Sequence, residues 1–251
     1  EQDFDVIISC GRKSIIPSIF LKKNSKKKII NIHIQNPKIS LKHFDFVVCP
    51  EHDNLEGPNV LTTKGAIHYL TLEEINNSKD YLLNKLERDK DVITLILGGP
   101  NKYYNYSDEN MISIFSRINR MLKEHNLQLV VIPSNRTPNK TIELSKEYFT
   151  DNRTVIDVVD KSAYLSSLAL SKYLVVTCDS TSMISEAALT GKPVYVAMIP
   201  ALRNDKRFQR FRNLFEKLNI IKILENKLET WNYEKLNEAD RIALEIKRKI
   251  N

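Results

Sequence analysis

Short apolar runs alternate with longer amphipathic segments along almost the whole chain. The runs are rich in Val, Ile and Leu, as strands buried on both faces are, and cover residues 4–9, 29–34, 44–49, 92–97, 129–132, 154–158, 173–176 and 194–198. Between them, apolar residues recur at helical spacing and predict helices that include residues 71–88, 107–122, 162–170, 203–218 and 232–250. Strands that alternate with helices favour parallel sheets with right-handed crossovers.

The chain is long enough for two α/β domains. Its 251 residues allow two ordinary domains or one large one, and the polar segment 87–91 is the best boundary. We predict two doubly wound, Rossmann-like domains, residues 1–90 and 91–251, whose strand ends face one cleft. The last helix could pack back on the first domain. The chain lacks an initiator Met and begins almost at a strand, so we expect the first domain to be truncated.

Composition narrows the class of protein. The chain is 42% hydrophobic and 27% charged, which is enough for packed cores, and it has neither a long apolar run nor a signal peptide. The net charge of +7 favours an anionic partner: a phosphate ligand, a lipid surface or a nucleic acid. The densest basic cluster is Lys22, Lys23, Lys26, Lys27 and Lys28. It fits a solvated loop better than a bilayer contact, and no nucleic-acid-binding motif accompanies it.

Three cysteines bear on the compartment and on metal binding. Cys10, Cys49 and Cys178 are far apart and form no C-x-x-C pair. This pattern indicates reduced, cytoplasmic thiols and no structural zinc. Because each follows an apolar strand, we expect each to be a small buried residue.

The stretch 175–196 carries the strongest local pattern: strand, polar loop, helix, Gly-x-Pro break, strand. Four residues that supply helix N-caps crowd the expected start of the helix: Asp179, Ser180, Thr181 and Ser182. The N–H groups and positive end of this helix would face a ligand beyond the strand. Glu186 falls one to two turns inside, where a carboxylate can accept two ribose hydroxyls. Gly191 and Pro193 end the helix. An ordinary βαβ turn that binds nothing uses the same caps, and local features do not separate the two readings.

Two further loops follow strands in the second half. Gly98 and Gly99 permit the close backbone approach that a phosphate-binding loop needs, although the sequence is neither G-x-G-x-x-G nor a Walker A motif. Ser134, Arg136 and Thr137 would lie beside that loop, where an Arg can clamp a diphosphate. A turn punctuated by Ser and Pro explains this second group equally well.

In the first half, His52 with Asp53, or Arg12 with Lys13, are the candidates for acid–base or acceptor-binding chemistry. A single His is more often structural than catalytic, and the remaining histidines have no ligand-like spacing. The sequence also lacks a serine nucleophile elbow and an H-E-x-x-H motif.

Taken together, these segments resemble the ELM1-like family, which is named for the plant mitochondrial-fission factor and is widespread in bacteria. The likeness covers nearly all of the chain, and family members usually carry another βα unit before the first strand found here. Its residues are 57–66, Gly98-Gly99-Pro100-Asn101-Lys102-Tyr103-Tyr104, Ser134-Asn135-Arg136-Thr137-Pro138, 179–196, Arg207-Phe208-x-Arg210-Phe211 and Trp231-x-Tyr233-x-x-Leu236-Asn237-Glu238.

The second half is also similar to the nucleotide-sugar domain of GT-B glycosyltransferases. Ser185-Glu186-Ala187-Ala188-x-x-Gly191-x-Pro193 resembles the donor motif of the enzyme that adds N-acetylglucosamine to lipid-linked peptidoglycan precursor. That enzyme's motif Glu holds the ribose, and this role falls on Glu186 here. The Gly-rich acceptor loop typical of that enzyme's first strand is not visible.

The resemblance implies a GT-B-like protein that binds a UDP-linked sugar, with metal-independent glycosyl transfer of the cell-envelope type as its reaction. The expected sugar-nucleotide residues are Gly98, Gly99, Lys102, Ser134, Arg136, Thr137, Asp179, Ser180, Ser182, Met183 and Glu186. Arg136 replaces a metal, so neither a metal nor a cofactor is expected. Gly11, Arg12 and Lys13 would lie on the acceptor side, with His52 as the base. The alternative is a non-catalytic adaptor bound peripherally to an anionic surface such as the inner membrane.

Overall fold

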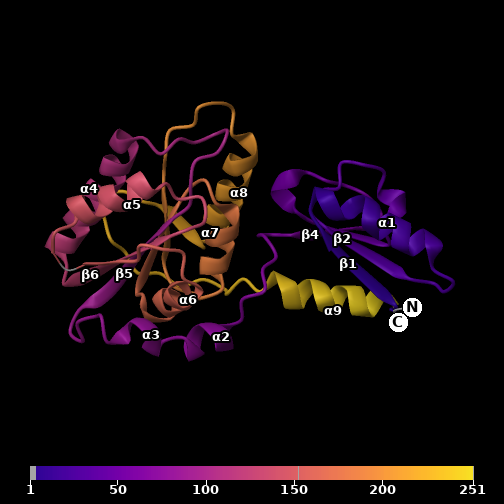
Figure 1. Cartoon of the computed structure of the whole chain (residues 1–251), viewed down its shortest axis with the longest axis horizontal. Helices are drawn as coiled ribbons and strands as arrows, with labels where there is room; N and C mark the ends of the chain where they lie inside the picture. The colour runs from indigo at the N-terminus through magenta and orange to yellow at the C-terminus, as the bar shows by residue number, and fades with distance from the viewer. Residues whose placement is uncertain (1–3, 152, 251) are drawn as a thin grey trace. The chain divides into compact units, whose positions relative to one another are not determined.

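The computed structural model describes residues 4–151 and 153–250, which form two compact units (Figure 1). Unit 1 comprises residues Glu1–Ile67 and Asn237–Asn251, and unit 2 comprises His68–Leu236. Each unit is built on its own parallel sheet, so each is described by itself.

Unit 1 has a four-stranded sheet in the order β1-β2-β3-β4, with every neighbouring pair parallel. Its elements are β1 (Val6–Cys10), η1 (Arg12–Ser14), α1 (Ile15–Asn24), β2 (Ile30–Ile34), η2 (Leu41–His43), β3 (Phe46–Pro50), η3 (Glu51–Asp53), β4 (Val60–Thr63) and α9 (Glu238–Ile250). The strand order follows the chain order, so successive connections step across the sheet in one direction.

Helices cover both faces of this sheet. Successive side chains of a strand point to opposite sides, so neighbouring residues of β3 contact different helices. Val47 of β3 packs with Ile15 of α1 in one apolar cluster. Val48, the next residue, packs with Ile242 of α9 in another. Two helices from opposite ends of the numbering therefore enclose one sheet.

Polar contacts fix the start of α9 on β4. Glu238 is buried and accepts the Lys64 N–H at 2.7 Å. Its carboxylate also pairs with Arg241 at 2.8 Å, and Arg241 Nη2 donates to the Thr62 carbonyl at 2.6 Å. These donors compensate the buried charge of Glu238. They also hold the first turn of α9 against the end of β4.

Unit 2 has a six-stranded parallel sheet in the order β10-β9-β8-β5-β6-β7. Its strands are β5 (Asp91–Leu97), β6 (Leu127–Pro133), β7 (Arg153–Val155), β8 (Tyr173–Thr177), β9 (Val194–Ala197) and β10 (Ile221–Ile223). Its helices are α2 (Leu72–Asn77), α3 (Asp80–Leu83), α4 (Asp108–Glu124), α5 (Asn139–Tyr148), α6 (Lys161–Leu170), α7 (Thr181–Ala188) and α8 (Lys206–Lys217).

The strand order of unit 2 reverses direction once. The chain starts in the middle of the sheet at β5, moves outward through β6 to β7, and returns to the other side of β5 with β8. This is the order of a doubly wound, dinucleotide-binding sheet. At the reversal the loops after β5 and β8 turn to opposite faces, and open α/β sheets bind their ligands at this position.

The helix expected over 107–122 forms where the periodicity predicts it. On α4 the residues at helical spacing, Met111, Ile114, Phe115, Ile118 and Met121, are all buried, and the Ser107 side chain caps the helix by accepting the Asn110 N–H at 3.3 Å. Thr71 caps α2 in the same way through the Glu74 N–H at 3.1 Å.

The boundary between the units lies at residues 67/68, whereas the polar segment 87–91 is the boundary that the sequence favours. The intervening segment packs on α6. Ser166 donates to the Lys79 carbonyl at 2.8 Å and accepts the Leu82 N–H at 3.0 Å. These contacts tie the segment to unit 2.

The same contacts correct the single helix predicted over 71–88. A continuous helix would need the Leu82 N–H for its own ladder, but this N–H donates to Ser166 instead. The segment therefore forms two short helices, α2 and α3, and helical structure ends at Leu83. Other expectations shift as well: α9 begins at Glu238 rather than at residue 232, and β4 and β10 are strands that the pattern did not predict.

The three cysteines are free thiols with different surroundings. Cys49 and Cys178 are buried as expected, but Cys10 is exposed because it ends the edge strand β1. Burial raises the pKa of the Cys178 thiol to about 11, and the Ile199 N–H that it accepts at 3.3 Å offsets part of this effect.

We expect one fast-reacting thiol in the native protein. At about pH 8 a chromogenic disulfide reagent should modify Cys10 quickly, while Cys178 stays protonated and inaccessible. Cys10→Ser should remove the fast phase, and denaturant should expose all three thiols of the wild type. A fast phase that survives in Cys10→Ser would contradict the burial of Cys49 and Cys178.

Candidate functional site

Three polar loops meet at the carboxyl edge of the unit 2 sheet. They follow β5 (Gly98 and Gly99), β6 (residues 134–137) and β8 (Asp179 and Ser180). Because β6, β5 and β8 are neighbours in the sheet, these loops lie side by side. The structure thus brings together the residues that the sequence places after separate strands.

Asp179 joins the three loops. Its side chain is fully buried, and its Oδ2 accepts the Gly99 N–H at 3.0 Å and Arg136 Nη2 at 2.9 Å. Tyr106, from the segment before α4, donates to Oδ1 at 2.6 Å. Donors from two other loops thus compensate the buried carboxylate, as a buried charge requires.

Gly98 and Gly99 owe their identity to this packing. A Cβ added to Gly98 would overlap the Asp179 carboxylate, and one added to Gly99 would overlap the Arg136 carbonyl. The Gly98 N–H donates to Thr177 Oγ1 at 2.9 Å. Both amides therefore have partners inside the protein, which differs from the expectation that they face a phosphate.

The residues after β6 divide into internal and surface roles. Ser134 donates to the Gly98 carbonyl at 2.8 Å, and buried Thr137 donates to the Leu97 carbonyl at 2.9 Å. Arg136 donates to the Gly99 carbonyl at 2.9 Å, yet 43% of its side chain stays exposed. Arg136 can therefore hold the loop and still present positive charge to solvent.

The N-terminus of α7 supplies further donors. Ser180 is buried and caps the helix by accepting the Met183 N–H at 3.4 Å. The N–H groups of Thr181 and Ser182 lie in the first turn, where a helix supplies no carbonyl acceptor of its own. Ser182 is also exposed. This end of the helix carries the positive end of the helix dipole and suits an anion.

Glu186 lies one turn further along the same face, because residues four apart on a helix are neighbours. It is half-buried, and its Oε2 accepts the Tyr164 hydroxyl at 2.5 Å. Burial raises the pKa of the Glu186 carboxyl, and the Tyr164 hydrogen bond acts in the opposite direction. The side chain is thus half-buried, and one carboxylate oxygen is already engaged.

Sequence reasoning missed Tyr106 and Tyr164. Both hydroxyls reach site carboxylates from segments that are distant in the chain, and neither residue stands in a motif. Their burial and the neighbouring carboxylates raise both pKa values well above the usual tyrosine range, so both stay protonated donors.

The remaining candidates belong to unit 1. Gly11 has a left-handed φ of 77° after β1, and Arg12 and Lys13 are exposed in η1. His52 is only 2% exposed, in η3 beside Asp53. A general base must reach its substrate, and the buried ring of His52 offers no such access in this structure.

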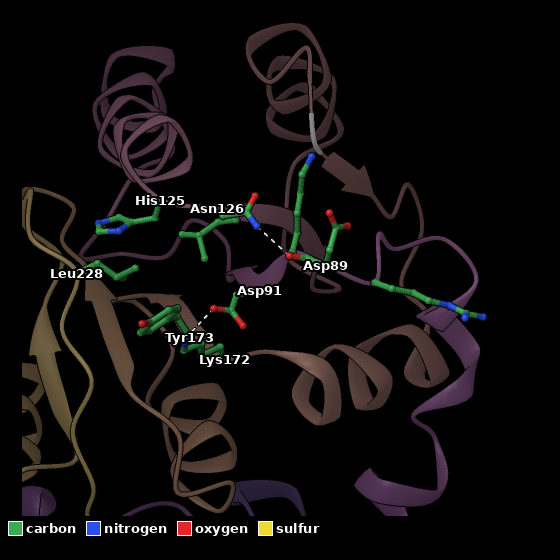
Figure 2. Close-up of a pocket in the computed structure, with 10 residues that line it drawn as sticks. Asp89, Asp91, His125, Asn126, Lys172, Tyr173 and Leu228 are labelled. Carbon is green, nitrogen blue, oxygen red and sulfur yellow. Dashed lines mark hydrogen bonds and ion pairs between the residues drawn. The ribbon is translucent and has the colours of Figure 1, made fainter.

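A hollow of about 330 Å³ lies at the opposite edge of the unit 2 sheet, among residues that begin β5, β6 and β8 (Figure 2). Lys172 pairs there with Asp91 at 2.6 Å, and Asn126 donates to the Asp89 carbonyl at 2.8 Å. Its polar groups contact one another, and it lies at the strand ends where open α/β sheets do not bind ligands.

The described residues, 4–151 and 153–250, hold neither a metal-binding cluster nor a membrane-spanning helix. No group of three or more His, Cys, Asp or Glu side chains is arranged to hold a metal ion. No helix in these ranges is both long and apolar enough to cross a membrane.

The fold places the chain among α/β proteins of the GT-B type. A UDP-GlcNAc 2-epimerase from Neisseria meningitidis bound to UDP-GlcNAc matches 98% of this chain and 76% of its own, with a TM-score of 0.55 and 14% identity. A putative UDP-N-acetylglucosamine 2-epimerase from Listeria monocytogenes matches 96% and 66%, with a TM-score of 0.57 and 15% identity. A glycosyltransferase from Rickettsia africae matches 98% and 76%, with a TM-score of 0.50 and 11% identity.

The chain belongs to the mitochondrial fission ELM1 family, whose model matches residues 2–250. It is 26% identical to the uncharacterized protein RP120 of Rickettsia prowazekii (strain Madrid E), covering 97% of this chain and 79% of that protein. It is 24% identical to the mitochondrial fission protein ELM1 of Arabidopsis thaliana, covering 98% of this chain and 64% of that protein. The resemblances to this family and to the GT-B fold are thereby confirmed.

The packing of the Gly-Gly loop yields a stability prediction. Gly98→Ala should lower the free energy of unfolding by about 2 kcal/mol, because the new methyl overlaps the Asp179 side chain. In an Asp179→Ala background that overlap disappears, so the same substitution should cost about 1 kcal/mol less. Urea unfolding of the four proteins measures this coupling.

Gly99→Ala is the matched control. Its methyl meets the carbonyl group and Cβ of Arg136 rather than the Asp179 side chain, so Asp179→Ala should not relieve it. Strict additivity of Gly98→Ala and Asp179→Ala would show that the carboxylate does not dictate glycine at this position.

Proposed function

We propose that this protein binds a nucleoside-diphosphate sugar, of the UDP-linked class, at the carboxyl edge of the unit 2 sheet. One observation carries the proposal: the N-terminus of α7 follows β8 at the reversal of strand order, and Glu186 lies one turn inside. A helix N-terminus suits the diphosphate and a carboxylate suits the ribose. The helical rise sets the first-turn N–H groups and the residue that carries the carboxylate roughly 5 Å apart along the axis.

Each residue of the site receives a role. Ser182 and the first-turn amides of α7 contact the diphosphate, and exposed Arg136 and Lys102 neutralise it in place of a metal. Glu186 accepts ribose hydroxyls, and half-buried Met183 offers apolar contact to the nucleoside. The other residues shape the loops behind the ligand: Gly98, Gly99, Ser134, Thr137, Asp179 and Ser180.

Similar structures support the choice of nucleotide. The Neisseria epimerase was solved with UDP-GlcNAc, and a Methanocaldococcus jannaschii UDP-GlcNAc 2-epimerase, with a TM-score of 0.50, with UDP-GlcNAc and UDP. The reaction that fits the GT-B fold is metal-independent glycosyl transfer, with Gly11, Arg12 and Lys13 on the acceptor side. We assign no step to His52, because its ring is buried.

Calorimetric titration with UDP and UDP-sugars tests the proposal. The wild type should bind, and Glu186→Gln should weaken UDP affinity about tenfold, since a hydrogen bond to a charged group is lost. Glu147→Gln, at an exposed position on α5, is the control and should bind as the wild type does. No heat of binding by the wild type at millimolar UDP would exclude this ligand class.

A second function, peripheral attachment to an anionic membrane on its cytoplasmic side, is favoured by the surface of α1. Ile16 and Phe20 lie one turn apart and are 70% and 63% exposed. Three exposed lysines, Lys23, Lys26 and Lys28, continue from that helix, while Lys22 and Lys27 pair with Asp45 and Asp5. An apolar helical face beside basic residues suits an anionic interface.

Vesicle sedimentation tests this attachment. At low salt the wild type should pellet with vesicles of phosphatidylglycerol and phosphatidylcholine, but not with phosphatidylcholine alone or at high salt. Replacing Ile16 and Phe20 with Ser should abolish pelleting, whereas the same change at exposed Val158 and Val159 of unit 2 should not. Equal pelleting of both double variants would refute a role for α1.

A further inference from the structure

The contact between Tyr164 and Glu186 joins two helices at the site. Tyr164 lies in the first turn of α6, whose N-terminus is fixed because Asp160 accepts the Ala163 N–H at 3.0 Å. Its hydroxyl meets Glu186 Oε2 on α7 at 2.5 Å. The tyrosine ring packs against the main apolar cluster of unit 2, so a rigid body holds the donor.

We propose that Tyr164 is a positioning residue that fixes the Glu186 carboxylate, engaging Oε2 so that Oε1 faces the ribose. This inference rests on the proposed binding of a nucleoside diphosphate. The residue that orients the ribose contact would then lie on α6, whereas the carboxylate itself lies on α7.

Tyr164 also favours the ionised form of Glu186. A protonated carboxyl would be a poorer acceptor for ribose hydroxyls, and burial pushes Glu186 toward that form. The Tyr164 hydroxyl donates to the charged form and opposes this effect. Because burial and the Glu186 charge raise the pKa of Tyr164 itself, its hydroxyl remains a donor throughout the physiological range.

Orientation has a consequence for recognition. With Oε2 already engaged by Tyr164, Oε1 is the better available acceptor, and the ribose hydroxyl nearer to it makes the stronger hydrogen bond. Removing the tyrosine hydroxyl would let the carboxylate rotate about its last side-chain bond, where barriers are low. The two ribose hydroxyls should then contribute more equally to affinity.

The experiment compares wild type, Tyr164→Phe and Tyr148→Phe by calorimetry. The ligands are UDP, 2′-deoxy-UDP, 3′-deoxy-UDP and pyrophosphate. Tyr148 on α5 packs against Phe115 and Phe149 and is the matched control. In the wild type one deoxy ligand should bind about tenfold more weakly than UDP. In Tyr164→Phe the ratio of the UDP affinity to the affinity for that deoxy ligand should fall to about two, and the pyrophosphate affinity should stay unchanged. Tyr148→Phe should behave as wild type.

Other outcomes separate the two claims. If the wild type binds no UDP, the proposed function fails and the role of Tyr164 falls with it. If the wild type binds UDP and Tyr164→Phe keeps the full deoxy ratio, the positioning role alone is wrong. A parallel loss of pyrophosphate affinity in Tyr164→Phe would also overturn it, because the substitution would then act through general disruption of the site.

Discussion

The buried carboxylate of Asp179 is the interaction on which the site of unit 2 depends. It follows β8, yet its partners come from the loops after β5 and β6. A sheet of this order separates its loops at the reversal, and Asp179 reconnects them. One charge with three donors, Gly99, Arg136 and Tyr106, thereby fixes the floor over which a ligand would lie.

This arrangement explains which parts of the site could be foreseen. Ser180 as a helix cap and the neighbourhood of Gly98 and Arg136 follow from turn chemistry and strand order. The reason for the glycines does not, because a Gly-Gly pair fits a phosphate and a protein carboxylate equally well. Only the structure shows Asp179 beside Gly98. Tyr164 carried no signal, since a tyrosine on a largely buried helix usually belongs to the core.

The fold was predictable to a similar degree. Apolar periodicity identified most strands and helices. Because strands alternate with helices along the chain, parallel sheets could also be predicted. It could not place the division between the units, because this division depends on a tertiary contact: Ser166 breaks the expected helix over 71–88 and holds its halves on α6. Burial of His52 was equally invisible, because a histidine after a strand looks the same whether its ring faces solvent or packing.

The return of α9 to unit 1 has a consequence during synthesis. The strands of unit 1 leave the ribosome early, but the helix that covers one of their faces comes after all of unit 2. Until then Ile32 and Val48 have no cover from α9, so unit 2 can complete its core while unit 1 still waits. Cellular chaperones would therefore meet the nascent chain at the unit 1 sheet, and shortened translation products would be cleared through that same uncovered surface.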